Sequence, residues 1–353
     1  MEIRIYDEDL RLIGIIENQS SLIWQRRFFE PGEFKLTAPA TRENIALIEM
    51  NRLVTYRGAK EAGIIENIEL KKKAGESIME VSGRFLESIF DRYIIRGAAV
   101  NFSGDAADVM GYIKWQSGPP TYTRIYDGTV QAETHTNITL QTTYKGILAT
   151  LTKVGRATGN GFRVRPNFTD HKMYFDIMTG YDRSSSQSTN SRVEFSDRFD
   201  NIKQVEYRAN NQNYKNHAYI GGEGEGQSRY YLEYDEEGAT IDHNKRRSVF
   251  IDAKDIDSTD LTAEEYQAKL IDRAKQKLAE MKPSVTIEAT VDPNGNFKYR
   301  EDYDLGDIVT IRFDEWGIKM DQRITEIMEI YEHEIAEIVP TFGEPLPTAL
   351  DSD

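Results

Sequence analysis

The fold of this chain is indicated by the segment IIENIEL at residues 64–70, because a similar segment, ITEIMEI, stands at residues 324–330. Ahead of each segment lies a second match, VTYR at residues 54–57 and VTIR at residues 309–312. Apolar and polar residues alternate in these segments, which is typical of strands that bury one face. The repeated order of two matching strands predicts that one β unit occurs twice in the chain.

The spacing of two glycines supports the same interpretation. Gly83 and Gly343 each close the last strand of a copy, and they lie 260 residues apart, as the two segments do. Alternating strands also resemble one another by chance, because a period of two is common in β proteins. The shared order and spacing favour duplication, in which each copy forms one small β-barrel or tube-like unit.

The stretches between the copies set the predicted domain bounds. Helical spacing of apolar residues begins at Arg84, and the polar stretch 182–190 has the composition of a loop. The predicted fold class is mainly β, with two similar small β-barrel or tube-like domains flanking a mixed α/β region. The bounds are 1–83 for the first β domain, 84–190 for the α/β insertion, 191–345 for the second β domain and 346–353 for a C-terminal tail.

One amphipathic helix is expected inside the second β domain, over residues 262–281. Thr262 and Glu265 have the spacing of a capping box, and Pro283 ends the helix. A short helix is expected over residues 41–48, with Thr41 as its cap and with Ile45, Leu47 and Ile48 turned inward. The remaining predicted helices cover residues 105–113 and a stretch that begins at Thr143.

The composition excludes several classes of function. The chain has 353 residues, with 44 Lys and Arg against 59 Asp and Glu, and its net charge of −15 has the wrong sign for gripping nucleic acid. The absence of cysteine excludes disulfides and thiolate metal sites. No run of 18 apolar residues occurs, so we expect no membrane partner.

No motif that carries catalytic chemistry stands out. The sequence HEIAE at residues 333–337 has Glu337 where a zinc-protease helix needs its second histidine. The remaining histidines are His135, His171, His217 and His243, and they lack the spacing of metal ligands. We therefore predict no catalytic residue, no metal and no cofactor, and we expect the protein not to be an enzyme.

A glycine-rich loop is the one candidate contact site. It comprises Gly222, Glu223, Gly224, Glu225 and Gly226. The third glycine of a dinucleotide fingerprint is missing, since Gln227 stands nearest to its place, and the two glutamates would repel a pyrophosphate. The loop is therefore predicted to be a hairpin tip or a subunit contact.

Five short motifs resemble phage tail hub proteins, the baseplate hub and tail-tip proteins of contractile and long non-contractile tails. They are FFEPGEFKL at 28–36, GRFL at 83–86, GEGEG at 222–226, LGD at 305–307 and GE at 343–344. The resemblance spans nearly the whole chain. It implies a homotrimer with two tube-like β domains per subunit, which adapts a sixfold tail tube to a threefold tip and lines the channel for genome passage.

The resemblance also implies partners and a location. The partners are a hexamer of tail tube or distal tail protein, the C-terminus of the tape-measure protein, and spike or fibre proteins of the tip. DNA passes through such a hub without specific binding, and the net acidity would keep it from adhering to the wall. The expected location is the virion tail tip, after synthesis and assembly in the cytoplasm of the host bacterium.

Two alternatives from other classes stay open at this point. One is a tail-associated cell-wall hydrolase that uses an Asp/Glu pair within residues 84–190, since glycosidases need only two suitably placed carboxylates. The other is a distal tail adaptor or a receptor-binding β protein. Cell-wall lysis would distinguish the hydrolase, and a hexameric mass would distinguish the adaptor.

Overall fold

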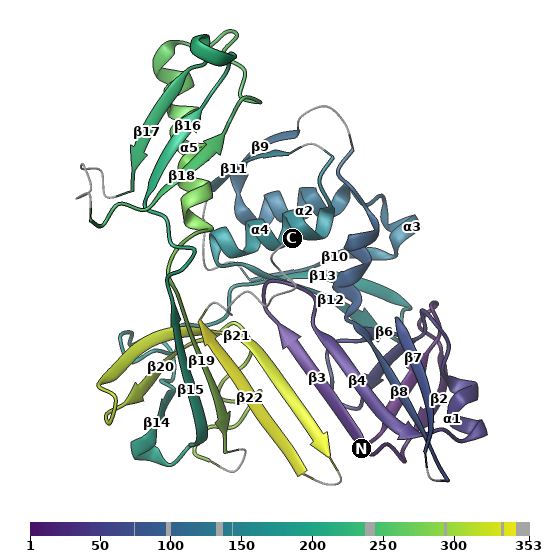
Figure 1. Ribbon diagram of the computed structural model, residues 1–353. Coiled ribbons are helices and arrows are strands. Elements are labelled where there is room, and N and C mark those ends of the chain that lie inside the picture. The colour runs from purple at the N-terminus through teal and green to yellow at the C-terminus, as the bar shows by residue number, and fades with distance from the viewer. Residues whose placement is uncertain are drawn as a thin grey trace. The chain divides into compact units, whose positions relative to one another are not determined.

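The computed structural model describes residues 1–73, 75–96, 100–131, 137–142, 144–236, 244–292, 295–332 and 335–343 (Figure 1). The described chain divides into two compact units, Met1–Glu206 with Ile287–Gly343, and Tyr207–Thr286. The predicted tail at 346–353 and the predicted cap Thr143 lie outside the described residues, and the predicted domain bounds remain predictions. No helix in the described part of the chain is long and apolar enough to cross a membrane.

The first β region contains eight strands and one short helix. Six of its elements are β1 (Ile3–Tyr6), β2 (Leu12–Ile16), β3 (Ser21–Arg27), β4 (Glu33–Pro39), α1 (Arg42–Leu47) and β5 (Leu53–Tyr56). The last three are β6 (Gly63–Ile64), β7 (Asn67–Lys73) and β8 (Glu76–Arg84). Strands β2-β1-β5-β6 form one sheet and β3-β4-β8-β7 belong to a second. Between them lies a core that includes Trp24, Phe34 and Val81.

The second β region repeats this arrangement with six strands. They are β14 (Glu194–Ser196), β15 (Ile202–Asn210), β19 (Ser284–Val291), β20 (Ile308–Phe313), β21 (Ile318–Glu332) and β22 (Ile335–Gly343), with the 3-10 turn η2 (Asp197–Phe199) after β14. Its core includes Phe195, Val309 and Phe342, and Phe195 lies 5.5 Å from Phe342 between ring centroids.

The duplication is visible in the order of strands within one large sheet. Its main path runs β15-β19-β22-β21-β3-β4-β8-β7. We call β3-β4-β8-β7 the first module and β15-β19-β22-β21 the second module. In each module the spatial order is first, second, fourth and third strand of the chain. The two matching segments of the sequence lie on the third strand, β21, and on its counterpart β7 with the preceding β6. This arrangement confirms the predicted fold class.

The α/β insertion packs on a core that it shares with part of the first β region, including Leu10, Leu53 and Ile64. Its elements are η1 (Leu86–Arg92), β9 (Val100–Asp105), α2 (Ala106–Trp115), α3 (Pro120–Thr123), β10 (Ile125–Val130), β11 (Asn137–Thr142), α4 (Ile147–Thr158), β12 (Gly161–Asn167) and β13 (Lys172–Met178). Helix α4 presents Leu151 and Val154 to that core, which also contains Phe90, Ile113 and Phe162.

The second compact unit is a three-stranded sheet with a helix. Its elements are β16 (His217–Gly221), η3 (Gly226–Ser228), β17 (Tyr231–Asp235), β18 (Ser248–Asp252) and α5 (Ala263–Ala279). The predicted capping box of α5 is present, because Glu265 N donates to Thr262 Oγ1 and Thr262 N donates to the Glu265 carboxylate. Tyr266, Leu270 and Ala274 are the buried stripe of α5.

One detail of the predicted helix at 41–48 is wrong. Thr41 caps α1 as expected, through a hydrogen bond from Asn44 N. Leu47 and Ile48 pack against the core as predicted, whereas Ile45 is 39% exposed. Asn44 is the buried side chain of the helix, and it bonds to Asn18 and to the carbonyl of Pro39. In a helix this short, the cap and these side-chain hydrogen bonds turn Ile45 to the solvent.

Candidate functional site: the junction of the modules and the free sheet edges

The two modules are joined inside the chain by a pair of antiparallel strands. Residues 326–332 of β21 pair with residues 21–27 of β3, in the register Glu326 with Arg27 and Glu332 with Ser21. Gln25 donates to the carboxylate of Glu326 at 2.6 Å, and Arg27 lies 3.5 Å from the same residue. This junction is the observed way in which one module docks onto another.

A buried arginine lies at the centre of the junction. Arg26 of β3 is 3% exposed, and its guanidinium donates to Glu61 at 2.9 Å and to Tyr299 at 2.6 Å. It also contacts Asp304 at 2.5 Å. Burial by itself would lower the Arg26 pKa, but the negative groups around it, Glu61 foremost, outweigh burial and hold that pKa well above its usual range.

A buried carboxylate completes the polar core of the junction. Glu329 of β21 is fully buried and accepts hydrogen bonds from Tyr299 at 2.7 Å, Arg300 at 2.8 Å and Tyr331 at 2.7 Å, and also one from Tyr56. Arg26 and Glu329 come from strands of different modules, so the polar network spans the seam between them. Such a network adds little to the net free energy of folding. It disfavours any other register, because a one-residue slip of β21 would turn Glu329 to the opposite face of the sheet and leave Tyr299 and Arg300 without their acceptor.

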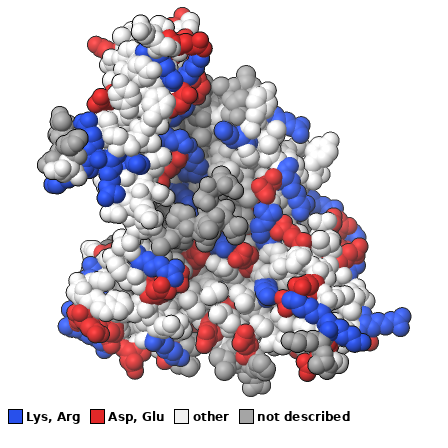
Figure 2. Space-filling model, viewed as in Figure 1, with Lys and Arg blue, Asp and Glu red and all other residues white. Residues whose placement is uncertain are grey.

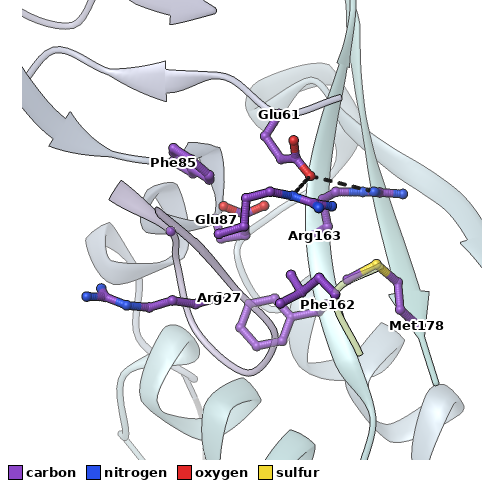
Figure 3. Close-up of a pocket in the computed structure, with 10 residues that line it drawn as sticks. Arg27, Glu61, Phe85, Glu87, Phe162, Arg163 and Met178 are labelled. Atoms are coloured by element: carbon purple, nitrogen blue, oxygen red, sulfur yellow. Dashed lines mark hydrogen bonds and ion pairs between the residues drawn. The ribbon is translucent and has the colours of Figure 1, made fainter. Parts of the chain in front are cut away.

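A small cavity lies beside this network, where the first module meets the insertion (Figure 3). Its volume is about 10 Å³, and its lining includes Glu61, Glu87, Phe162 and Arg163. Glu87 is 3% exposed and accepts a hydrogen bond from Val164 N at 2.8 Å. Burial raises the pKa of Glu87 to about 7. A space of this size holds one water molecule at most, so it is no substrate pocket.

The two ends of the large sheet are the candidate assembly site. Along the described strands, β7 and β15 each have a neighbour on one side only, and they stand at opposite ends of the path (Figure 1). Strand β7 is the counterpart of β21, and β15 is the counterpart of β3. The strands at the two free edges are therefore the counterparts of the two strands that pair within the chain. The edge of β7 is thus complementary to the edge of β15.

The face of the sheet opposite to the core carries paired charges. Lys35 and Lys71 both lie within 3.0 Å of Glu80, and Arg27 lies 3.0 Å from Glu33. Figure 2 shows acidic and basic side chains interspersed over the visible surface, with neither sign gathered in one large field. Since each of these cations has a carboxylate partner, this face offers little free positive charge to a phosphate backbone.

The predicted contact loop belongs to the second compact unit and is firmly anchored. Glu223 N donates a hydrogen bond to the Tyr266 hydroxyl at 2.7 Å, and the Glu223 carboxylate accepts one from the hydroxyl of Ser258 at 2.6 Å. Gly224 has a φ of +100°, a conformation that favours glycine. Glu225 at the tip pairs with Lys254 at 2.6 Å. Its role as a subunit contact stays a prediction.

The histidines do not gather. His171 lies 3.2 Å from the carbonyl of Leu10, and His217 lies 2.9 Å from the hydroxyl of Ser248. Among the described residues, no three His, Asp or Glu side chains are grouped so that they could hold a metal ion. The other histidines lie outside the described residues, and they are His135, His243 and His333.

Sequence reasoning missed the polar network around Arg26 and Glu329. One signal was present, since Glu326 and Glu329 are three residues apart in a strand and must therefore point to opposite faces. One of these glutamates had to be buried.

Comparison with known proteins places the chain in a family. The profile of the family described as "Siphovirus ReqiPepy6 Gp37-like protein" matches residues 2–344. No curated protein matches the chain.

Solved structures share the fold over nearly their whole length. The chain is similar to the tail protein from Neisseria meningitidis MC58, with a TM-score of 0.62 and 14% identity, over 97% of this chain and 96% of that one. It is similar to the prophage MuSo2 43 kDa tail protein from Shewanella oneidensis, with a TM-score of 0.60 and 13% identity, over 97% and 98%. It is also similar to prophage tail protein gp18 from Listeria monocytogenes EGD-e, with a TM-score of 0.57 and 10% identity, over 99% and 96%. The chain therefore belongs to the siphovirus ReqiPepy6 Gp37-like family and has the fold of phage and prophage tail proteins.

Proposed function

We propose that this protein is the structural hub of a phage tail tip or baseplate. Three copies form a ring that adapts the sixfold tail tube to a threefold tip, and the ring encloses the channel through which the genome passes. The protein has no catalytic role in this proposal, and it acts through its shape and its contacts.

The observation that carries the proposal is the correspondence between the paired and the free strands. Within the chain, the third strand of one module (β21) pairs with the first strand of the other (β3). The third strand of the first module (β7) and the first strand of the second (β15) are left at the ends. The same pairing between neighbouring copies joins β7 to β15 and extends the sheet. Three copies then carry six similar modules, and closure of the ring leaves no edge exposed.

The charged face of the sheet is proposed to line the channel. Three of its described cations, Arg27, Lys35 and Lys71, are paired with glutamates, and Lys35 lies 3.0 Å from Glu80. A wall whose positive charges are neutralised lets DNA slide, because binding to the phosphate backbone needs free Lys and Arg to displace counterions. The net charge of −15 per chain points the same way.

The ring has two different sides for its partners. One side fits a hexamer of tail tube or distal tail protein, because six modules repeat around it. The other fits the threefold spike or fibre proteins, and the tape-measure C-terminus enters the channel. The second compact unit, with the loop 222–226, occurs once per chain and so repeats three times around the ring, which suits a contact on the threefold side.

The two most buried carboxylates of the described part of the insertion, Glu87 and Asp176, give the hydrolase alternative no support. Asp176 is held by Arg163 and Arg165, each at 3.0 Å, and Glu87 faces a cavity of about 10 Å³. A glycosidase needs an open cleft between two carboxylates that can hold a sugar. Incubation with cell walls is the direct control, and lysis would favour the hydrolase.

The test of the proposed function is the mass and shape of the assembly. Native mass spectrometry over a rising concentration series is expected to give a trimer, and electron micrographs of that trimer are expected to show an annulus with six similar densities. A hexamer would identify a distal adaptor and refute the hub. A trimer without a central opening, or a monomer at every concentration, would refute it as well.

A further inference from the structure

A hollow lies beside the free edge strand β15. Its volume is about 180 Å³, and its lining includes Ile202 and Val205 of β15 together with Phe313 and Trp316 at the turn between β20 and β21. Trp316 is 48% exposed, and its ring lies 5.3 Å from that of Phe313. The other lining residues are polar, so the hollow has an apolar side formed by these four residues, and a half-exposed tryptophan at such a place is typical of the anchor of a protein interface.

The junction inside the chain shows what occupies the corresponding place in the first module. There the turn after β5 contacts the loop that precedes β20. Arg300 donates to the carbonyl of Gly58 at 2.8 Å and to the hydroxyl of Tyr56 at 2.7 Å, and Lys60 lies 3.8 Å from Asp304. The docking pieces are therefore the turn after β5 on one side and the segment before β20 on the other.

Each docking piece has a counterpart in the other module. Strand β20 pairs with the start of β21 as β5 pairs with β6, so the turn after β5 corresponds to the turn Asp314–Gly317. The segment before β20 corresponds to the segment before β5, which is residues 41–51 with helix α1. This segment lies next to the start of β7, because Asn51 N donates to the carbonyl of Ile65 at 2.9 Å.

The segment 41–51 of a single copy exposes two apolar side chains to water. Ile45 is 39% exposed and Met50 is 52% exposed. Placed at a contact, two such side chains would each lose water-exposed apolar area, which favours association. We propose that the hollow at Trp316 receives Ile45 and Met50 of the next copy in the ring. This inference rests on the proposed function, because it assumes that β7 and β15 of neighbouring copies pair.

The charges around the two surfaces are mixed. The hollow is lined by Asp197 and Glu315 together with Lys203, which lies 3.4 Å from Asp292. The segment 41–51 carries the exposed Arg42, Glu43 and Glu49, and Glu49 lies 2.7 Å from Arg52. The apolar side chains, and not a difference in net charge, therefore carry the proposed contact.

The absence of cysteine makes the contact testable by cross-linking. Trp316→Cys and Met50→Cys are made as separate variants, mixed, and treated with a short bismaleimide. A covalent dimer is expected from the mixture, and the double variant is expected to give covalent trimers. The matched control is Trp115→Cys mixed with Met50→Cys, because Trp115 is 46% exposed and lies on α2, away from both surfaces. That control is expected to give no dimer.

A second pair of cysteine variants tests the same contact while it keeps the proposed anchor residues. Glu315→Cys mixed with Glu49→Cys keeps both Trp316 and Met50, and it is expected to give the same covalent dimer. In addition, Trp316→Ala is expected to raise the dissociation constant of the trimer by at least about tenfold, whereas Trp115→Ala leaves it within about twofold.

Native mass spectrometry of the same samples distinguishes failure of the contact at Trp316 from failure of the ring. A trimeric mass without the covalent dimer from either cysteine pair overturns the contact at Trp316 and leaves the ring standing. A monomeric mass without any covalent dimer overturns the ring together with the contact.

Discussion

The buried carboxyl of Glu87 makes the stability of this protein depend on pH in a defined direction. Glu87 is 3% exposed, and burial raises its pKa from the ordinary glutamate value of 4.5 to about 7. One oxygen accepts the hydrogen bond from Val164 N, and the other, Oε2, has no hydrogen-bond partner among the described residues. Glu61 raises the pKa further, while Arg163 lowers it.

The sign and size of the effect follow from linkage. The folded protein holds the Glu87 proton more tightly than the unfolded chain does, so the contribution of Glu87 to folding falls as the pH rises from about 4.5 to about 7. The shift of the Glu87 pKa from about 4.5 to about 7 lowers the free energy of unfolding by about 3 kcal/mol at pH 8. At pH 5 the same shift lowers it by less than about 1 kcal/mol.

Glu87→Gln removes this titration and keeps the acceptor for Val164 N. We expect the free energy of unfolding of the variant, relative to the wild type, to be higher by about 2 kcal/mol at pH 8 than at pH 5. Denaturant unfolding at the two pH values measures it, and Glu17→Gln at an exposed position is the control, with no pH-dependent difference. An effect of Glu87→Gln that is the same at both pH values would refute the reasoning.

Three further substitutions test the junction and the backbone. Glu329→Gln leaves Arg300 without its buried counter-charge and is expected to lower the free energy of unfolding by about 3 kcal/mol in denaturant titration. The control is Glu332→Gln on the same strand, which is expected to change the same free energy by less than about 0.5 kcal/mol. Thr262→Ala removes the cap of α5 and is expected to cost about 1 kcal/mol, which hydrogen exchange of α5 amides would detect. Gly180→Ala is expected to cost more than about 1 kcal/mol in thermal unfolding, because φ is +69° and an added Cβ would lie 2.0 Å from the Gly306 carbonyl oxygen.

Local signals in the sequence predicted the parts of the fold that local physics determines. The capping box of Thr262 and Glu265 requires two side chains three residues apart, and both of its hydrogen bonds are formed. The pattern in residues 324–330 predicted a strand, which is present, but not the buried face, because Thr325, Ile327 and Glu329 are buried while Met328 and Ile330 lie on the other face. The resemblance to phage tail proteins was confirmed by the match of the family profile over residues 2–344 and by the shared fold.

Long-range pairing could not be read from the same signals. The repeat predicted two similar units, but nothing in the sequence states that β21 pairs with β3 and joins them into one sheet. The polar network follows from that pairing, since Arg26 and Glu329 come together only at the seam. The exposure of Ile45 has a similar cause, because the rotation of α1 is fixed by Asn44 and its bond to Asn18.

In the proposed ring, the junction inside the chain and the junction between copies differ in the free energy that they must supply. The junction inside the chain is linked by the backbone, so it loses no rotational and translational freedom when it forms, and it can use a network such as that of Arg26 and Glu329, which fixes register at little net gain. The junction between copies must supply net free energy to overcome that loss, and buried apolar area supplies it. The same docking geometry therefore requires charge on one seam and apolar anchors on the other. The exposed Trp316 and Met50 stand where this reasoning requires the anchors.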